Sequence, residues 1–117
     1  MQKSIMKEIF SSERRHDERF PIESLVTISD GQRFYVESVT DISKSGAGLE
    51  ALQEFPVSSR LTMFFPSNSR FKIEGIVRWV WKKGHMNRMG LQFMNMTTKQ
   101  KNSINELIHR FSSAPAI

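Results

Sequence analysis

The sequence contains no cysteine, which excludes disulfides, thiolate metal ligands and a cysteine nucleophile. It also lacks any apolar run approaching the roughly 20 residues that span a bilayer. Residues 1–8 lack the unbroken apolar stretch of a secretory signal. A chain of 117 residues suits one domain. These features predict a single cytoplasmic domain with no membrane insertion.

Patterns for catalysis and metal binding are also missing. The sequence has three histidines, at positions 16, 85 and 109, but neither H-x-x-x-H nor H-E-x-x-H occurs. Ser43, Asp41 and His16 could be drawn as a triad, yet no G-x-S-x-G turn accompanies them. We therefore expect neither an enzyme nor a metal or cofactor site.

What the chain does have is an excess of basic side chains. Its 17 lysines and arginines outnumber 12 acidic residues, for a net charge of +5. Such an excess favours an anionic partner, because basic side chains attract phosphates at long range. Three arginines gather at one place, Arg14, Arg15 and Arg19.

Short segments with the composition of β-strands fill most of the chain. They lie at residues 22–29, 33–42, 49–52, 60–65, 71–82 and 89–94, and Asp30-Gly31 predicts a two-residue hairpin turn. Near residues 71–82, alternation predicts one shared face for Phe71, Ile73, Gly75, Val77, Trp79 and Trp81. Thr97 or Thr98 can cap a final helix with the apolar stripe Ile104, Leu107, Ile108 and Phe111. The pattern predicts a mostly β protein, a six-stranded antiparallel barrel with a C-terminal α-helix that covers one end.

The predicted organisation is one domain over residues 13–112, with a binding loop at 13–20, the barrel at 21–96 and the helix at 97–111. Residues 1–12 form a flexible or helical arm, since Ile5/Ile9 and Met6/Phe10 have helical spacing. Residues 113–117 are a tail.

Two motifs carry candidate binding chemistry. In the first, Arg15-x-x-x-Arg19, each guanidinium can donate paired hydrogen bonds to phosphate oxygens or to O6 and N7 of guanine. In the second, the carboxylate of Asp41 can accept from guanine N–H donors, with Ser43 beside it. Gly46 and Gly48 would permit positive φ and close approach of a ligand. Taken alone, the first motif is better explained by a solvated basic loop and the second by an ordinary turn between two strands.

Together and in this order, the motifs resemble the two-part signature of the PilZ domain family. The likeness extends over residues 13–96 and includes Gly75-Ile76-Val77-Arg78-Trp79 and Met89-Gly90-Leu91-Gln92-Phe93. It implies a six-stranded antiparallel barrel that binds the bacterial second messenger cyclic di-GMP.

The resemblance also implies roles for individual residues. Arg15 and Arg19 would bind phosphates and guanine edges, Asp41 and Ser43 would contact a guanine, and Gly46 would leave space for it. Arg14 lies at a position where the residue varies among family members and where the side chain influences whether one or two ligands bind. An arginine there favours an intercalated ligand dimer. Trp79 lies on a strand that lines the site in some relatives, although the alternation favours a core position for it.

Three functions follow as expectations. The first is a stand-alone receptor, monomeric or weakly dimeric, in which the ligand orders the N-terminal loop and alters contacts with an unidentified effector protein in motility, biofilm or exopolysaccharide control. The second is a PilZ-fold adaptor that binds no nucleotide. The third is a small nucleic-acid-binding barrel, disfavoured because the aromatic residues of 71–82 are expected on the face opposite the charges.

Overall fold

The computed structural model describes residues 17–66 and 71–112, and the predicted arm at 1–12 and tail at 113–117 lie outside them. Within the described residues are six strands and one helix: β1 (Phe20–Ser29), β2 (Phe34–Ile42), β3 (Gly46–Ala51), β4 (Arg60–Phe64), β5 (Lys72–Lys83), β6 (Met86–Met94) and α2 (Thr98–Ser112). All strand pairs are antiparallel and close into a barrel in the order β1-β2-β3-β6-β5-β4. The predicted barrel with a C-terminal helix is confirmed.

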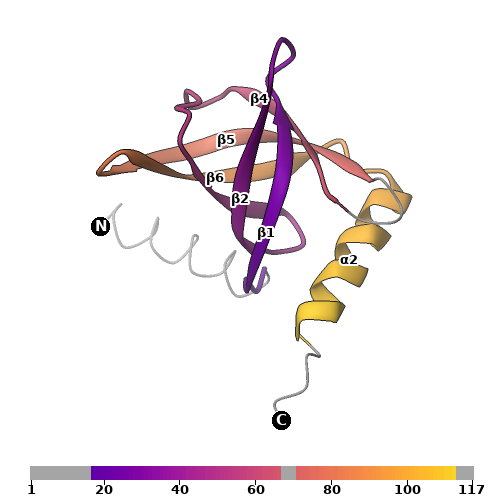
Figure 1. The fold of residues 1–117 in the computed structure, drawn as a ribbon. Coiled ribbons are helices and arrows are strands. Elements are labelled where there is room, and N and C mark those ends of the chain that lie inside the picture. The colour runs from indigo at the N-terminus through magenta and orange to yellow at the C-terminus, as the bar shows by residue number, and fades with distance from the viewer. Residues whose placement is uncertain (1–16, 67–70, 113–117) are drawn as a thin grey trace, which may run out of the picture.

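The strand order brings distant parts of the sequence together. β3 lies beside β6, and β4 joins β1 to β5, so the barrel closes without following chain order. In Figure 1, β5 and β6 cross β1 and β2 at a steep angle, and the tips of the β1–β2 and β5–β6 hairpins extend beyond the barrel. Strands β1, β5 and β6 therefore belong to one closed barrel, although β1 is far from the other two in the sequence.

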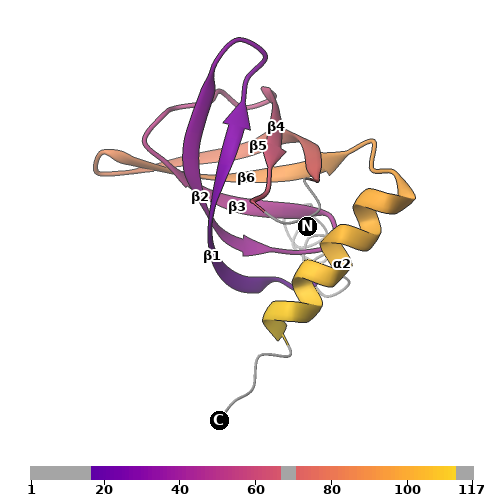
Figure 2. The same cartoon turned by 45° about the vertical axis from the view of Figure 1, so that its right-hand side comes forward.

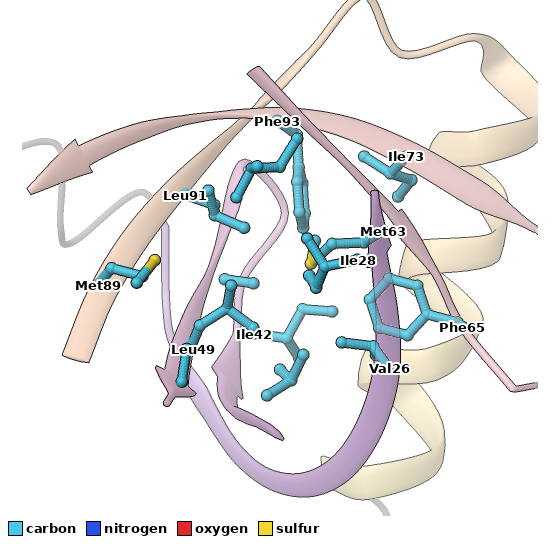
Figure 3. Packing of buried hydrophobic residues seen from close by; sticks show 14 of the residues in the cluster. Val26, Ile28, Ile42, Leu49, Met63, Phe65, Ile73, Met89, Leu91 and Phe93 are labelled. Atoms are coloured by element: carbon cyan, nitrogen blue, oxygen red, sulfur yellow. The ribbon is translucent and has the colours of Figure 1, made fainter. Parts of the chain in front are cut away.

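The barrel interior is filled by the inward-facing residues of every strand. Figure 3 shows side chains from all of them converging on one centre, including Ile28, Leu49 and Met63. Each of these three is fully buried. The alternation of strands, with one face in and one face out, produces this core.

The β1–β2 hairpin differs from the predicted two-residue turn. Ser29 pairs with Phe34, so the loop contains four residues. The side chain of Asp30 accepts hydrogen bonds from the backbone N–H of Gln32 at 2.9 Å and of Arg33 at 2.8 Å. Donation from the backbone N–H of Arg33, followed by that of Gln32, lowers the pKa of the Asp30 carboxyl. The prediction was wrong because this side-chain capture favours a wider loop, with Gly31 at φ +96°.

The alternation predicted for β5 holds only up to Val77. Val77 lies opposite Leu91 and Trp79 lies opposite Gly90, so Arg78 is an extra residue in a β-bulge. Trp79 and Trp81 consequently face outward and are 40% and 61% exposed. Their predicted position on the core face is wrong, because one inserted residue reverses the alternation.

A second bulge interrupts β2 at Thr40. Val39 lies opposite Leu49, and Asp41 lies opposite Gly48. The extra residue allows Val39 and Ile42 both to face the core, although their spacing is odd. Thr40 and Asp41, between them, both lie on the outer side.

Helix α2 follows β6 and lies against the barrel beside β1 (Figure 2). Ile104 and Ile108 are buried as predicted, at 1% and 8% exposure. Thr97 is the cap: its Oγ1 accepts from the N–H of Gln100 at 3.1 Å, while Gln100 Oε1 accepts from the N–H of Thr97 at 2.8 Å. Gln100 also donates to the carbonyl of Lys72 at 2.7 Å. No helix of the described residues combines the length and apolar character needed to cross a bilayer.

The capping geometry generates a stability prediction. Thr97→Ala removes the hydroxyl that accepts from Gln100 and should lower the free energy of unfolding by about 1 kcal/mol in urea denaturation. Thr98→Ala is the matched control, because Thr98 is the first residue of the helix and exposed. Equal stability of the two variants would contradict the assignment of Thr97 as the cap.

Candidate functional site

A cleft of about 740 Å³ lies where the start of β1, the β2–β3 turn and the middle of β5 and β6 meet. Its size falls within the range of about 300–1,000 Å³ that is usual for small-molecule sites. The lining residues are Asp17, Arg19, Ser43, Ser45, Gly46, Arg78, Trp79, Gly90, Leu91 and Gln92. A smaller hollow of about 410 Å³, near Tyr35 and Phe55, contains none of the predicted site residues.

The β2–β3 turn is shaped by Ser43. Its backbone N–H donates to the carbonyl of Gly46 at 2.9 Å, and its Oγ accepts from the N–H groups of Ser45 at 3.3 Å and Gly46 at 3.1 Å. The hydroxyl also donates to the carbonyl of Gly46 at 3.3 Å. Ser43 is 4% exposed, so its side chain mainly fixes the turn that forms one wall of the cleft.

Asp41 and Arg19 are paired. Arg19 Nη1 donates to Asp41 Oδ1 at 2.9 Å, with 47% and 22% of the two side chains exposed. Thr40 Oγ1 donates to the other carboxylate oxygen at 3.4 Å. An ion pair this exposed contributes little to stability, on the order of 0–1 kcal/mol. Its consequence is positional: the Asp41 carboxylate holds the Arg19 guanidinium at the edge of the cleft.

Gly48 and Gly90 form a flat floor. They pair across β3 and β6 on the outer side of the barrel, where any other residue would project a side chain. A Cβ on Gly48 would lie 2.5 Å from Asp41 Oδ2, and a Cβ on Gly90 would overlap the indole of Trp79. The carboxylate of Asp41 and the ring of Trp79 therefore lie over adjacent glycines.

The glycines of the second motif do not adopt the positive φ that was predicted for them. Among the described glycines, positive φ occurs at Gly31 and Gly84, and not at Gly46 or Gly48. A Cβ on Gly46 would collide with the carbonyl oxygen of Leu91, because the turn is pressed against β6. The N–H of Phe93 donates to the carbonyl of Ser45 at 2.8 Å and locks this contact. The prediction of positive φ was wrong: the backbone of β6 leaves no room for a side chain at Gly46, and the side chain of Asp41 leaves none at Gly48.

Arg78 and Gln92 were not predicted as site residues, but both line the cleft. Arg78 Nε donates to Gln92 Oε1 at 2.6 Å across β5 and β6. The alternation assigned Arg78 to the face opposite Trp79, whereas the bulge places both side chains outward. A bulge leaves no clear signal in a regular alternating pattern, so sequence reasoning could not have found this arrangement.

The other predicted site residues are partly outside the structure. Arg14, Arg15 and His16 lie outside the described residues, as does any triad involving His16. Arg19, Ser43, Gly46 and Trp79 line the cleft, while Asp41 contacts Arg19 and Gly48 pairs with Gly90 beside it. In residues 17–66 and 71–112, no group of three or more acidic, histidine or cysteine side chains could hold a metal ion.

Comparison with protein families gives a decisive match. The sequence model of the PilZ domain matches residues 13–110, most of the chain. The chain belongs to the PilZ domain family. No curated protein sequence matches it.

Solved structures share this PilZ fold at low sequence identity. The PilZ domain of YcgR from Escherichia coli with c-di-GMP is 12% identical, with a TM-score of 0.71 and coverage of 86% of this chain and 92% of that one. The inhibitor of motility MotI/DgrA of Bacillus subtilis is 16% identical, with a TM-score of 0.70 and coverage of 86% and 51%. MrkH of K. pneumonia in complex with c-di-GMP is 15% identical, with a TM-score of 0.70 and coverage of 86% and 53%. The chain thus spans about half the length of MotI/DgrA and MrkH.

The glycine floor can be tested without a ligand. In a Trp81→Phe background, Trp79 is the sole tryptophan, and Gly90→Ala should push its indole off the floor. We expect a red-shifted fluorescence maximum and destabilisation of about 1–3 kcal/mol. Gly75→Ala is the control, because its Cβ would meet Gln92 O at 3.3 Å and Leu91 Cβ at 3.4 Å and would not meet Trp79. A red shift of the same size in the control would argue against the floor.

Proposed function

We propose that this PilZ domain is a receptor for cyclic di-GMP, a binding protein and not an enzyme. The observation that carries the proposal is the convergence of Arg19, Ser43 and Gly46 on one cleft, with Asp41 in contact with Arg19. These residues come from separate parts of the sequence, and an ordinary turn would not require the arginine beside it. The bound c-di-GMP in the YcgR and MrkH structures supports the same ligand.

The ligand chemistry fits the charges and donors of the cleft. Arg19 offers a planar guanidinium for a phosphate or the O6/N7 edge of guanine. Asp41 can accept the N1–H and N2–H donors of a guanine, and its pairing with Arg19 already orients the carboxylate. The backbone of the turn at Ser43–Gly46 forms one wall of the cleft and limits the size of a base that can lie beside it. Arg15 completes the arginine pair of the signature, and Arg14 favours two intercalated ligands by stacking on a further guanine.

The first test is calorimetric titration of the full chain with cyclic di-GMP. Arg19→Ala should weaken binding by about 2 kcal/mol or more, roughly thirtyfold, because it leaves a charged ligand group unpaired. Arg33→Ala is the matched control. Arg33 is an exposed arginine in the β1–β2 loop, and it does not line the cleft. No binding by the unmodified chain at tens of micromolar would sink the receptor proposal.

Binding should also order the segment before β1. Several arginines of like charge cannot pack together without an anion between them, so ligand capture should draw residues 10–20 onto the barrel. We expect slower amide hydrogen exchange at residues 14–19 when cyclic di-GMP is added. Exchange across the β1–β2 hairpin tip, residues 29–34, serves as the internal reference. Unchanged exchange at residues 14–19 under saturating ligand would rule out this relay.

The ordered loop would then alter contacts with an effector protein, in motility, biofilm or exopolysaccharide control. The alternative, an adaptor of the same fold that binds no nucleotide, predicts a partner whose capture is insensitive to cyclic di-GMP. A pull-down with and without the ligand distinguishes these two outcomes.

One observation favours a second candidate, nucleic-acid binding. Trp79, Trp81 and Arg78 share the outer surface, so the expected separation of aromatic residues from charges does not exist. Exposed aromatic rings beside cations are the features of a single-strand binding surface. A salt-dependent shift of single-stranded DNA or RNA that survives Arg19→Ala would support this candidate over the receptor.

A further inference from the structure

We infer that Arg78 is a further ligand-binding arginine, which reads the O6/N7 edge of a second guanine at the wall opposite Asp41. This inference rests on the proposed function, since it concerns the same ligand. The claim is independent of the two signature motifs, because Arg78 lies on β5 and outside both.

The bulge in β5 is the first support. A regular strand would place Arg78 and Trp79 on opposite faces of the sheet. The extra residue between Val77 and Trp79 places both outward, and both line the cleft. Bulges characteristically redirect a side chain near a binding site. Here the bulge directs two consecutive side chains, the guanidinium of Arg78 and the indole of Trp79, into the same cleft.

The contact with Gln92 is the second support. Gln92 Oε1 accepts from Arg78 Nε at 2.6 Å, which fixes the plane of the guanidinium. An arginine held through Nε still presents its two Nη groups, which donate two parallel hydrogen bonds end-on. Within residues 17–66 and 71–112, these Nη groups of Arg78 have neither an acceptor nor an ion-pair partner. Two parallel donors match the O6 and N7 acceptors of guanine, whereas adenine replaces O6 with an amino donor.

Trp79 supplies the third support, a surface for the face of the same base. Its indole lies over Gly90 and is 40% exposed. Aromatic side chains of this kind stack with purines. Arg78 at the edge and Trp79 at the face would together hold one base.

The two walls come from strands that are not neighbours in the barrel. Asp41 is on β2 and Arg78 is on β5, with β3 and β6 between them. Neighbouring strands are about 4.8 Å apart, so the two walls are about three strand spacings apart along the curved sheet. A cyclic dinucleotide carries two purines on one ring, so one ligand can present one base to Asp41 and the other to Arg78. Gly48 and Gly90 project no side chains of their own between the walls, so the carboxylate of Asp41 and the indole of Trp79 lie directly over them.

The test is calorimetric titration of the full chain with cyclic di-GMP and with its adenine counterpart, cyclic di-AMP. Arg78→Ala should weaken cyclic di-GMP binding about tenfold or more and reduce the preference for guanine over adenine. Arg78→Lys should lose nearly as much, since lysine keeps the charge but lacks the planar fork. Because Arg78 is exposed, both variants should keep the melting temperature of the unmodified chain, which separates a loss of binding from a loss of folding.

Gln92 acts as a positioning residue in this scheme. Gln92→Ala should reduce the guanine preference. Gln92→Glu should preserve it, because a carboxylate at this position still accepts the hydrogen bond from Arg78 Nε. A merely structural role for Gln92 would change the melting temperature of both variants and leave the guanine preference unaltered.

The outcomes separate the two proposals. If Arg19→Ala loses binding and Arg78→Ala binds cyclic di-GMP as tightly as the Arg33→Ala control, the inference about Arg78 is overturned and the receptor proposal stands. If the unmodified chain binds no cyclic di-GMP, both fall. A loss in Arg78→Ala and Arg78→Lys, with a lower guanine preference, supports both.

Discussion

The pairing of Gly48 with Gly90 is the contact on which the rest of the site depends. Both glycines occupy outward positions of central strands, where a side chain would normally project. Their bareness lets the carboxylate of Asp41 lie over one glycine and the indole of Trp79 over the other. Without this pairing, a cleft between β2 and β5 would be filled by the side chains of β3 and β6. Two missing side chains thus leave the space in which the carboxylate of Asp41 and the indole of Trp79 lie close to the sheet.

Two bulges complete the arrangement from either side. The bulge at Thr40 turns Asp41 outward while Ile42 returns to the core, and the bulge at Arg78 turns Trp79 outward. Each bulge changes the alternation by one residue, so the core and the site are built from the same strands. The apolar interior remains intact because Val39, Ile42 and Val77 are all buried.

The sequence predicted the fold well because the fold depends on periodicity and on turn residues. Six segments with the composition of β-strands and one amphipathic stripe are local signals, and they predicted the barrel and helix α2. It predicted part of the cleft, since Arg19, Ser43 and Gly46 belong to a recognisable pattern. The resemblance included Trp79 in the site, but alternation gave the wrong orientation for its side chain and missed Arg78 and Gln92, because strand alternation alone cannot locate an inserted residue. The sequence also misjudged Gly46 and Gly48, whose reason is a close approach by β6 or Asp41 and not a special φ.

The roles of Ser43, Arg19 and Arg78 differ because their side chains differ in burial. Ser43, though part of the signature, is 4% exposed and has its donor and its acceptor engaged within the turn. A group in that state shapes a wall more readily than it binds a ligand. Arg19 and Arg78 are exposed, and each is held by one neutralising or orienting partner, Asp41 and Gln92. Oriented cations that remain accessible have little conformational freedom left to lose when an anion arrives. Among the described residues, Arg19 and Arg78 are therefore the tethered arginines that we propose for recognition, and the turn between β2 and β3 forms one wall of the cleft that they line.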